Sequence, residues 1–297
     1  MIKLEEPETP VFLKMGFFGN TGTGKTFTTA KVLSQFIKDY CPEKQLAFYD
    51  TEPSSGYIKD MVKQITGKPL LAIHSRSFSD LIQFMDLCKE KGYVALMDSI
   101  THPWRTLVED YLVAKRSRVT GAGGNAANVR LSLKDWGPLK DMWGVFSSKF
   151  AWEPVHACIV GREGDVWESV DDDEGNSEMK KTGVKMKTET ETGFEPSLLV
   201  NMKLLNGKHY VYVVKDRFDV LTCKTSEAEP DIEFFRPHIE MLNLKGSGYK
   251  ENKPEPVFKN VPGPNYETIK SQRAAILESI KDDILLILPG MTADEKK

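Results

Sequence analysis

The chain has 297 residues, of which 40% are hydrophobic and 28% are charged, and its formal net charge is −3. This composition is typical of a soluble globular protein, and it argues against a membrane-spanning one, because no apolar run approaches the ~18 residues that cross a bilayer. The net negative charge excludes nucleic-acid binding through bulk basicity, so any such contact requires a local basic patch.

The first ten residues, MIKLEEPETP, are acidic and contain proline, unlike a signal peptide, and we expect a flexible N-terminus over residues 1–10. The four cysteines are scattered along the chain without a CxxC pair: Cys41, Cys88, Cys158 and Cys223. This pattern favours free buried thiols in a reducing cytosol over a disulfide or metal framework. We therefore expect a cytoplasmic protein.

A glycine-rich turn follows a predicted buried strand at 12–19 and precedes a helical pattern of apolar residues. Its sequence, GNTGTGKT, fits G-x-x-x-x-G-K-[ST], the phosphate-binding loop. Glycines let backbone N–H groups approach phosphate oxygens, and the following helix directs its positive end at the same anion. The alternative is an unrelated glycine-rich turn. The predicted nucleotide-binding residues are Gly19, Asn20, Thr21, Gly22, Thr23, Gly24, Lys25, Thr26 and Phe27.

Two side chains are predicted to hold a magnesium ion beside this loop. Thr26 offers a hydroxyl, and the segment 93–101 (YVALMDSIT) is a predicted strand that delivers Asp98 to the edge where the phosphates lie. Lys25 adds a positive charge for the β- and γ-phosphates. The alternative for Asp98 is a capping role at the end of the strand.

Two further predicted strands end in charged residues. The strand 45–52 ends in Asp50 and Glu52, and a carboxylate there can position and deprotonate an attacking water. The alternative is a helix N-cap or a loop salt bridge. The strand 155–163 ends in Arg162, a candidate sensor of the γ-phosphate, with an ordinary surface arginine as the alternative.

Helical patterns separate these strands at 79–91, 103–115 and 131–150. Strands that alternate with helices predict an α/β fold with a mostly parallel sheet covered on both faces. The third helical pattern carries large apolar side chains at near-helical spacing, which we interpret as core packing rather than a base-stacking platform: Trp136, Leu139, Trp143, Phe146 and Phe150.

Two hairpins are predicted after Arg162. Weak alternation on both sides of the acidic turn 171–176 indicates a mobile hairpin within 163–196. Strong strand patterns at 198–205 and 208–217 flank Asn206-Gly207, the preferred two-residue hairpin turn. The sheet is therefore expected to finish with antiparallel strands at one edge.

The predicted domain organisation follows from these elements. Residues 11–244 form the core, and residues 245–265 are rich in glycine, proline and lysine, as in a linker. Residues 266–297 are predicted to form an amphipathic helix, over 266–288, and a tail.

The order of these motifs resembles the ATPase core of RecA-type proteins over roughly residues 10–220. The phosphate-binding loop, the strand ending Asp-Thr-Glu, the strand ending in apolar-Asp-Ser and the terminal hairpin carry the resemblance. More closely, 183–202 and 211–217 (VYVVKDR) resemble the AAA-domain ATPases encoded by tailed phages, some of them RecA-like single-strand annealing proteins. The resemblance implies a RecA-like P-loop NTPase fold with an antiparallel hairpin edge.

The resemblance also implies a role for individual residues. Asp98 would be the Walker B carboxylate and Glu52 the residue that activates water. Lys215 and Arg217 match a basic pair that reaches into the neighbouring subunit's site and neutralises charge on the γ-phosphate. An exposed strand-end pair is the alternative. If the implied role holds, the active form is a homo-oligomer, a ring or filament, with ATP and Mg²⁺ at subunit interfaces.

Nucleic-acid contact would come from the segment 115–150, which carries seven basic residues and a flexible glycine loop. The candidate DNA contacts are Lys115, Arg116, Arg118 and Arg130, and a solvated helix end plus loop is the alternative. Residues 163–196 depart from the family pattern, because they hold four lysines against eleven acidic residues, which would repel phosphate.

We therefore expect an oligomeric Mg-dependent ATPase that acts on nucleic acid in phage recombination or replication, by binding or annealing single-stranded DNA. The alternative is an ATPase motor or assembly switch that acts on a protein complex, such as a loader or packaging factor, without direct DNA binding. A small-molecule kinase is a third hypothesis. It is disfavoured because the acidic hairpin supplies no arginine-rich lid.

Overall fold

The structure of the protein is a computed structural model, which describes residues 9–171, 177–221, 225–226 and 229–246. The chain divides into two units, Met1–Lys250 and Glu251–Lys297, and the second lies wholly outside the described residues. The predicted linker, from residue 247 on, and the predicted C-terminal helix also lie outside them, as do residues 1–8 of the predicted flexible N-terminus.

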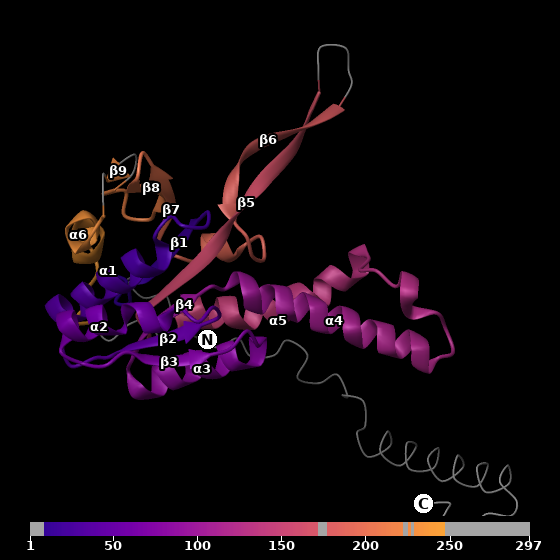
Figure 1. The fold of residues 1–297 in the computed structure, drawn as a ribbon, viewed down its shortest axis with the longest axis horizontal. Helices are drawn as coiled ribbons and strands as arrows, with labels where there is room; N and C mark the ends of the chain where they lie inside the picture. The colour runs from indigo at the N-terminus through magenta and orange to yellow at the C-terminus, as the bar shows by residue number, and fades with distance from the viewer. Residues whose placement is uncertain (1–8, 172–176, 222–224, 227–228, 247–297) are drawn as a thin grey trace, which may run out of the picture. The chain divides into compact units, whose positions relative to one another are not determined.

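A mostly parallel sheet forms the centre of the fold (Figure 1). The strands follow the order β3-β2-β4-β5-β1-β7-β8-β9, with β6 paired to β5 outside this path. All pairs from β3 to β7 are parallel, whereas β7–β8, β8–β9 and β5–β6 are antiparallel. The strands are β1 (Lys14–Gly19), β2 (Leu46–Asp50), β3 (Leu71–His74), β4 (Val94–Asp98), β5 (Ala157–Asp171), β6 (Ser177–Met186), β7 (Leu198–Leu205), β8 (Lys208–Asp216) and β9 (Thr225–Ser226).

Helices cover both faces of this sheet. One hydrophobic cluster joins the sheet to α1, α2 and α6, and a second joins its other face to α3, α4 and α5. The predicted α/β class with a mostly parallel sheet and an antiparallel edge is therefore confirmed. The helices are α1 (Lys25–Tyr40), α2 (Ser55–Thr66), α3 (Phe78–Lys91), α4 (Thr101–Gly121), α5 (Leu133–Trp152) and α6 (Ile232–Glu240), with short 3-10 helices η1 (Ala126–Asn128) and η2 (Thr192–Phe194).

The central strands are buried on both sides, which explains their continuous apolar runs. In β1, Met15 and Phe17 pack in the first cluster, whereas Phe18 packs in the second. In β4, Leu96 and Met97 divide in the same way. Successive side chains point to opposite faces of a strand, so each strand contributes to both halves of the core.

The aromatic side chains of α5 pack in the core, as expected. Trp143, Phe146 and Phe150 are almost fully buried, and the indole Nε1 of Trp143 donates a hydrogen bond to Thr192 Oγ1 at 2.8 Å. Trp136 differs, because it is 39% exposed and packs near Trp104. A base-stacking platform along the whole stripe is thus excluded by burial.

The strong C-terminal hairpin is confirmed. Asn206 and Gly207 both have positive φ angles, 51° and 75°, as a two-residue turn between twisted antiparallel strands requires. The pairing of Leu205 with Lys208 closes the turn directly.

Two predicted boundaries are wrong. The strand expected to end near Arg162 continues without a break to Asp171, because its second half leaves the parallel sheet and pairs with β6. The helix expected at 103–115 runs to Gly121, so the basic residues at 115–118 lie on a helix rather than in a loop. Sequence patterns also missed α2, β3 and α6.

Other expectations concern single features. Cys41, Cys88 and Cys158 are free and buried, whereas Cys223 lies outside the described residues. Most of the acidic turn, residues 172–176, is likewise not described. Among the helices that the structure describes, none combines the length and apolar character needed to cross a membrane.

Candidate functional site at the carboxyl edge of the sheet

The parallel register brings the predicted site residues to one edge of the sheet. Asp50 pairs with Asp98 across β2 and β4, and Gly19 pairs with Arg162 across β1 and β5. Loops that leave these strand ends surround a pocket of about 290 Å³ at the start of α1. The residues that line it are Thr21, Gly22, Gly24, Lys25, Thr26, Phe27, Glu52, Asp98, Ser99 and Arg162.

The turn between β1 and α1 has a backbone that only glycine adopts readily. Gly22 and Gly24 have φ angles of 79° and 80°, and a Cβ atom at Gly24 would lie 2.8 Å from the ring of His209. The helix α1 then begins at Lys25 with no acidic residue in its first turn. Unpaired N–H groups and the positive end of the helix dipole make such a helix start an anion-binding element.

Lys25, Thr26 and Asp98 form the polar floor of the pocket. The ammonium group of Lys25 donates to the backbone oxygen of Asn20 at 2.6 Å, and the Thr26 hydroxyl donates to Asp98 Oδ2 at 2.5 Å. Desolvation lowers the pKa of Lys25, although the nearby charges of Asp98 and Glu52 oppose this shift. Burial raises the pKa of Asp98 to about 6, against the hydrogen bond from Thr26 and the charge of Lys25.

The donor set at Thr26 and Asp98 fits magnesium. Mg²⁺ is usually held by one or two protein oxygens together with waters and phosphate oxygens, rather than by an all-protein cage. A hydroxyl and a carboxylate oxygen already lie side by side here. The described residues contain no group of three or more His, Cys, Asp or Glu side chains that could hold a metal ion.

The two carboxylates at the end of β2 have different surroundings. Asp50 is buried and accepts hydrogen bonds from the backbone N–H groups of Glu52, Ser54 and Ser55, at 2.8–3.1 Å. Asp50 therefore organises the turn that starts α2. Glu52 lies beyond the strand end, and its side chain is 48% exposed and lines the pocket.

One oxygen of Glu52 is approached by two cationic or potentially cationic groups. Arg162 Nη2 donates to Glu52 Oε1, and His102 Nε2 lies 3.6 Å from that oxygen. Partial desolvation pushes the pKa of Glu52 upward, but the hydrogen bond and charge of Arg162, helped by His102, bring this pKa below its ordinary value. Glu52 is thus held as a carboxylate at the rim of the pocket.

Glu163 fixes the second residue of the glycine-rich turn. Its Oε1 accepts from Asn20 Nδ2 at 3.0 Å, and its Oε2 accepts from the buried Asn201 Nδ2 at 2.8 Å. Glu163 lies on β5 where the strand leaves the sheet for its pairing with β6. These bonds connect the turn, β7 and the base of the β5–β6 hairpin.

Lys215 and Arg217 lie away from the pocket of their own chain. Lys215 on β8 pairs with Leu199 on β7, whereas the residue of β7 that pairs with Gly19 is Met202. Lys215 therefore lies three residues, or about 10 Å, from the level of Gly19 along the strands. Both side chains donate to the backbone oxygen of Phe194, Arg217 at 2.8 Å. Desolvation, with a contribution from the charge of Arg217, lowers the pKa of Lys215 to about 8.

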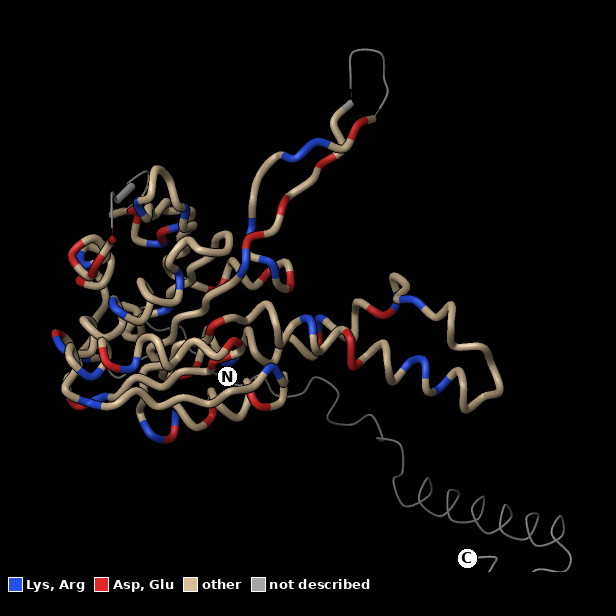
Figure 2. The backbone as a smooth tube through the Cα atoms, viewed as in Figure 1, with Lys and Arg blue, Asp and Glu red and all other residues tan. Residues whose placement is uncertain are grey.

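The candidate DNA contacts are largely engaged within the chain. Lys115 pairs with Asp135 at 2.6 Å and donates to the Arg130 backbone oxygen, while Arg116 and Arg130 donate to backbone oxygens of the loop after α4. Arg118 is exposed, and no bond of its side chain is described. In the β5–β6 hairpin, Figure 2 shows that acidic residues follow one strand and basic residues the other.

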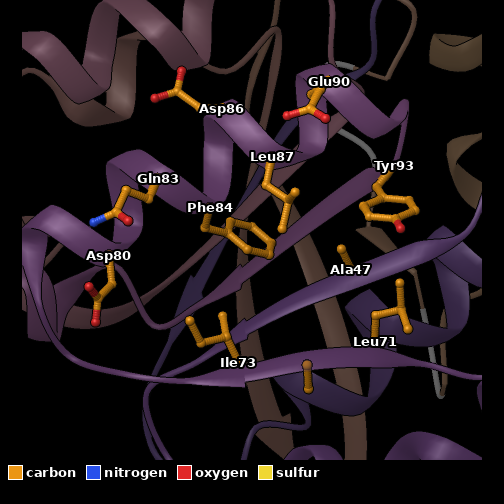
Figure 3. Close-up of a pocket in the computed structure, with 11 residues that line it drawn as sticks. Ala47, Leu71, Ile73, Asp80, Gln83, Phe84, Asp86, Leu87, Glu90 and Tyr93 are labelled. Carbon is orange, nitrogen blue, oxygen red and sulfur yellow. The ribbon is translucent and has the colours of Figure 1, made fainter.

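A second, larger pocket lies at the opposite edge of the sheet from the hairpin edge (Figure 3). It has a volume of about 590 Å³ between α3, β2 and β3, and Phe84, Leu87 and Ile73 give it a mainly apolar surface. It contains none of the residues of the glycine-rich turn, so it is separate from the candidate site.

The chain matches no model of a known protein family, and a search of curated proteins finds no significant match. Sequence reasoning missed four residues that line or contact the site: Ser99, His102, Glu163 and Asn201. Glu163 could have been predicted, because it is a charged residue that directly follows Arg162 at a predicted strand end. No local sequence pattern indicates a role for His102 or Asn201.

The raised pKa of Asp98 predicts how its replacement changes stability. Since the folded pKa of about 6 exceeds the ordinary value of 3.8, ionised Asp98 destabilises the fold above pH 6, and this cost disappears as the pH falls toward 4. We predict that Asp98→Asn raises the unfolding free energy by about 1–3 kcal/mol at pH 7.5 and by much less at pH 4.5.

Thermal or urea unfolding at both pH values measures this difference. Asp50→Asn is the matched control. Its amide N–H group would face the backbone N–H groups that donate to Asp50 in the wild type, so this variant should lose stability. A loss of stability in Asp98→Asn at pH 7.5 would contradict the prediction.

Proposed function

We propose that the protein is a Mg-dependent ATPase with a RecA-like P-loop core. The observation that carries the proposal is the convergence of Lys25, Thr26, Glu52, Asp98 and Arg162 on one pocket at the start of α1. These side chains supply a cation for phosphate, oxygens for a metal, a carboxylate base and a second cation. The parallel sheet with an antiparallel edge pair is compatible with this core.

The proposed roles follow from the chemistry of each group. The glycine-rich turn and the helix start would hold the β- and γ-phosphates, with Lys25 as a point charge. Thr26 and Asp98 would hold Mg²⁺, which neutralises phosphate charge when it is bound. Arg162 would turn from Glu52 toward the γ-phosphate, and the present Arg162–Glu52 pair is about half exposed on both sides.

Glu52 would orient and deprotonate the attacking water. Its Oε1 is engaged by Arg162, whereas no hydrogen bond to its Oε2 is described, so Oε2 is the oxygen available to accept a proton. Asp50 would not share this role, because its oxygens are occupied by backbone N–H groups and Ser54.

We propose further that the active form is an oligomer with ATP at the subunit interfaces. Lys215 and Arg217 are too far from the pocket of their own chain to act there, yet they lie together at the end of β8, where Lys215 is partly buried and Arg217 is exposed. Their present acceptor, the Phe194 backbone oxygen, is neutral, so a phosphate of a neighbouring subunit is a stronger partner.

For the substrate of the assembly, we propose single-stranded nucleic acid, as in phage recombination or replication. The supporting observation is the exposed basic end of α4, where Arg118 has no described partner, together with Lys134 at the start of α5. A protein complex is the second candidate. The internal contacts of Lys115, Arg116 and Arg130 favour a protein substrate, because they leave fewer cations free to bind phosphate.

Replacement of Glu52 tests the ATPase. We predict that Glu52→Gln keeps the affinity for ATP but lowers kcat by about 100-fold or more, because the amide cannot accept a proton. The measurements are phosphate release and binding of a fluorescent ATP analogue in the presence of Mg²⁺. Lys25→Ala should lose binding as well. Turnover by Glu52→Gln at the wild-type rate would refute Glu52 as the base.

A mixing experiment tests the interface. Lys25→Ala and Arg217→Ala should each be inactive, and an equal mixture should recover up to about a quarter of the wild-type rate, the fraction of interfaces with both groups intact. The Lys25→Ala/Arg217→Ala double variant, mixed with either single variant, is the control and should restore nothing. An inactive mixture of the single variants would count against the shared site.

Salt-dependent binding distinguishes nucleic acid from protein substrates. We predict that single-stranded DNA stimulates ATP turnover at low salt, and that Arg118→Ala/Lys134→Ala reduces the slope of log K against log salt by about 1.4. Lys59→Ala, an exposed lysine on α2, is the control and should leave the slope unchanged. No stimulation and no salt-sensitive binding would reject nucleic acid and favour the protein substrate.

A further inference from the structure

His102 lies directly behind the carboxylate that we propose as the base. It is the second residue of α4, four positions after Asp98, and it is only 8% exposed. It does not line the pocket itself. Its ring instead bridges two consecutive residues of the loop after β2: Nδ1 lies 2.6 Å from Thr51 Oγ1, and Nε2 lies 3.6 Å from Glu52 Oε1.

The distances around Thr51 favour one tautomer of this ring. Thr51 Oγ1 accepts from the backbone N–H of Ser99 at 2.8 Å, so its own proton is left to donate. The alternative acceptors are His102 Nδ1 at 2.6 Å and the Ser99 oxygen at 3.4 Å, and the shorter contact is the better bond. With Nδ1 as acceptor, a neutral ring carries its proton on Nε2, which faces Glu52.

Arg162 and His102 approach the same oxygen of Glu52. Arg162 Nη2 donates to Oε1, whereas His102 Nε2 lies 3.6 Å from Oε1, just beyond hydrogen-bond distance. Oε2 is left to accept a proton from water. Arg162 is half exposed and belongs to the pocket, whereas the His102 side chain is 10% exposed and fixed by Thr51. If Arg162 turns to a phosphate, Glu52 loses its hydrogen-bond partner, and His102 Nε2, 3.6 Å away, is the polar group that remains beside Oε1.

We propose that His102, fixed by Thr51, is a positioning residue: when Arg162 leaves Glu52, the 3.6 Å gap closes and Nε2–H donates to Glu52 Oε1, which holds Oε2 toward the attacking water. This inference rests on the proposed ATPase function and on Glu52 as its base. His102 touches neither nucleotide nor water in this role, so its loss should lower kcat without weakening ATP binding.

Three substitutions separate the contact with Glu52 from the contact with Thr51. His102→Gln places an amide N–H near the position of Nε2, whereas His102→Asn places its amide near Nδ1 and cannot reach Glu52. His102→Ala removes both contacts. We expect His102→Asn and His102→Ala to lower kcat about tenfold or more with KM changed less than about twofold, and His102→Gln to stay within about threefold of wild type.

Steady-state phosphate release by the full-length chain with MgATP, after a check of each variant's Tm, gives the answer. Retention in His102→Asn with loss in His102→Gln would show that only the Thr51 contact matters, and it would overturn the inference. Equal rates or equal losses in all three variants, or a change confined to KM, would overturn it too.

The wild-type protein and Glu52→Gln are measured in parallel. If wild-type turnover depends on Glu52, failure of the His102 pattern refutes the inference alone. If the wild type shows no Glu52-dependent turnover, the proposed function fails and the role of His102 fails with it.

Discussion

The parallel register of four strands is the constraint on which the site depends. Because β2, β4, β5 and β1 run in the same direction, their carboxyl ends meet at one edge, where Asp50 stands beside Asp98 and Gly19 beside Arg162. Both faces of the sheet are covered by helices, and β2 and β4 are apolar up to the aspartate that ends each of them. Polar chemistry is thereby concentrated where the loops can enclose a ligand.

This concentration has an energetic cost that the sequence does not reveal by itself. Asp98 ends a strand that is buried on both sides, so its carboxylate is desolvated and its pKa rises to about 6. Thr26 and Lys25 compensate only in part. A site that keeps an incompletely compensated carboxylate against a hydroxyl is suited to a cation, since a bound metal would supply the missing charge.

Sequence reasoning succeeded where the signal is local. The glycine-rich turn, the strand that ends in Asp98 and the hairpin at Asn206-Gly207 are each encoded by one continuous short segment of the chain. It failed where the determinant is a contact between distant positions. Glu163 contacts Asn20 across 143 positions, and His102 contacts Thr51 across 51. The short, exposed strand β3 and the engagement of Lys115 by Asp135 likewise depend on neighbours that no pattern names.

The cations proposed to meet phosphate differ in how firmly their present partners hold them. Lys25, Lys215 and Arg217 donate to neutral backbone oxygens, which compete poorly with a phosphate. Arg162 alone is paired with a carboxylate, but both side chains are about half exposed, and such pairs contribute only about 0–1 kcal/mol. Release of Arg162 is therefore inexpensive in itself. Its consequence falls on Glu52, whose carboxylate would then depend on the buried imidazole of His102 to keep its orientation.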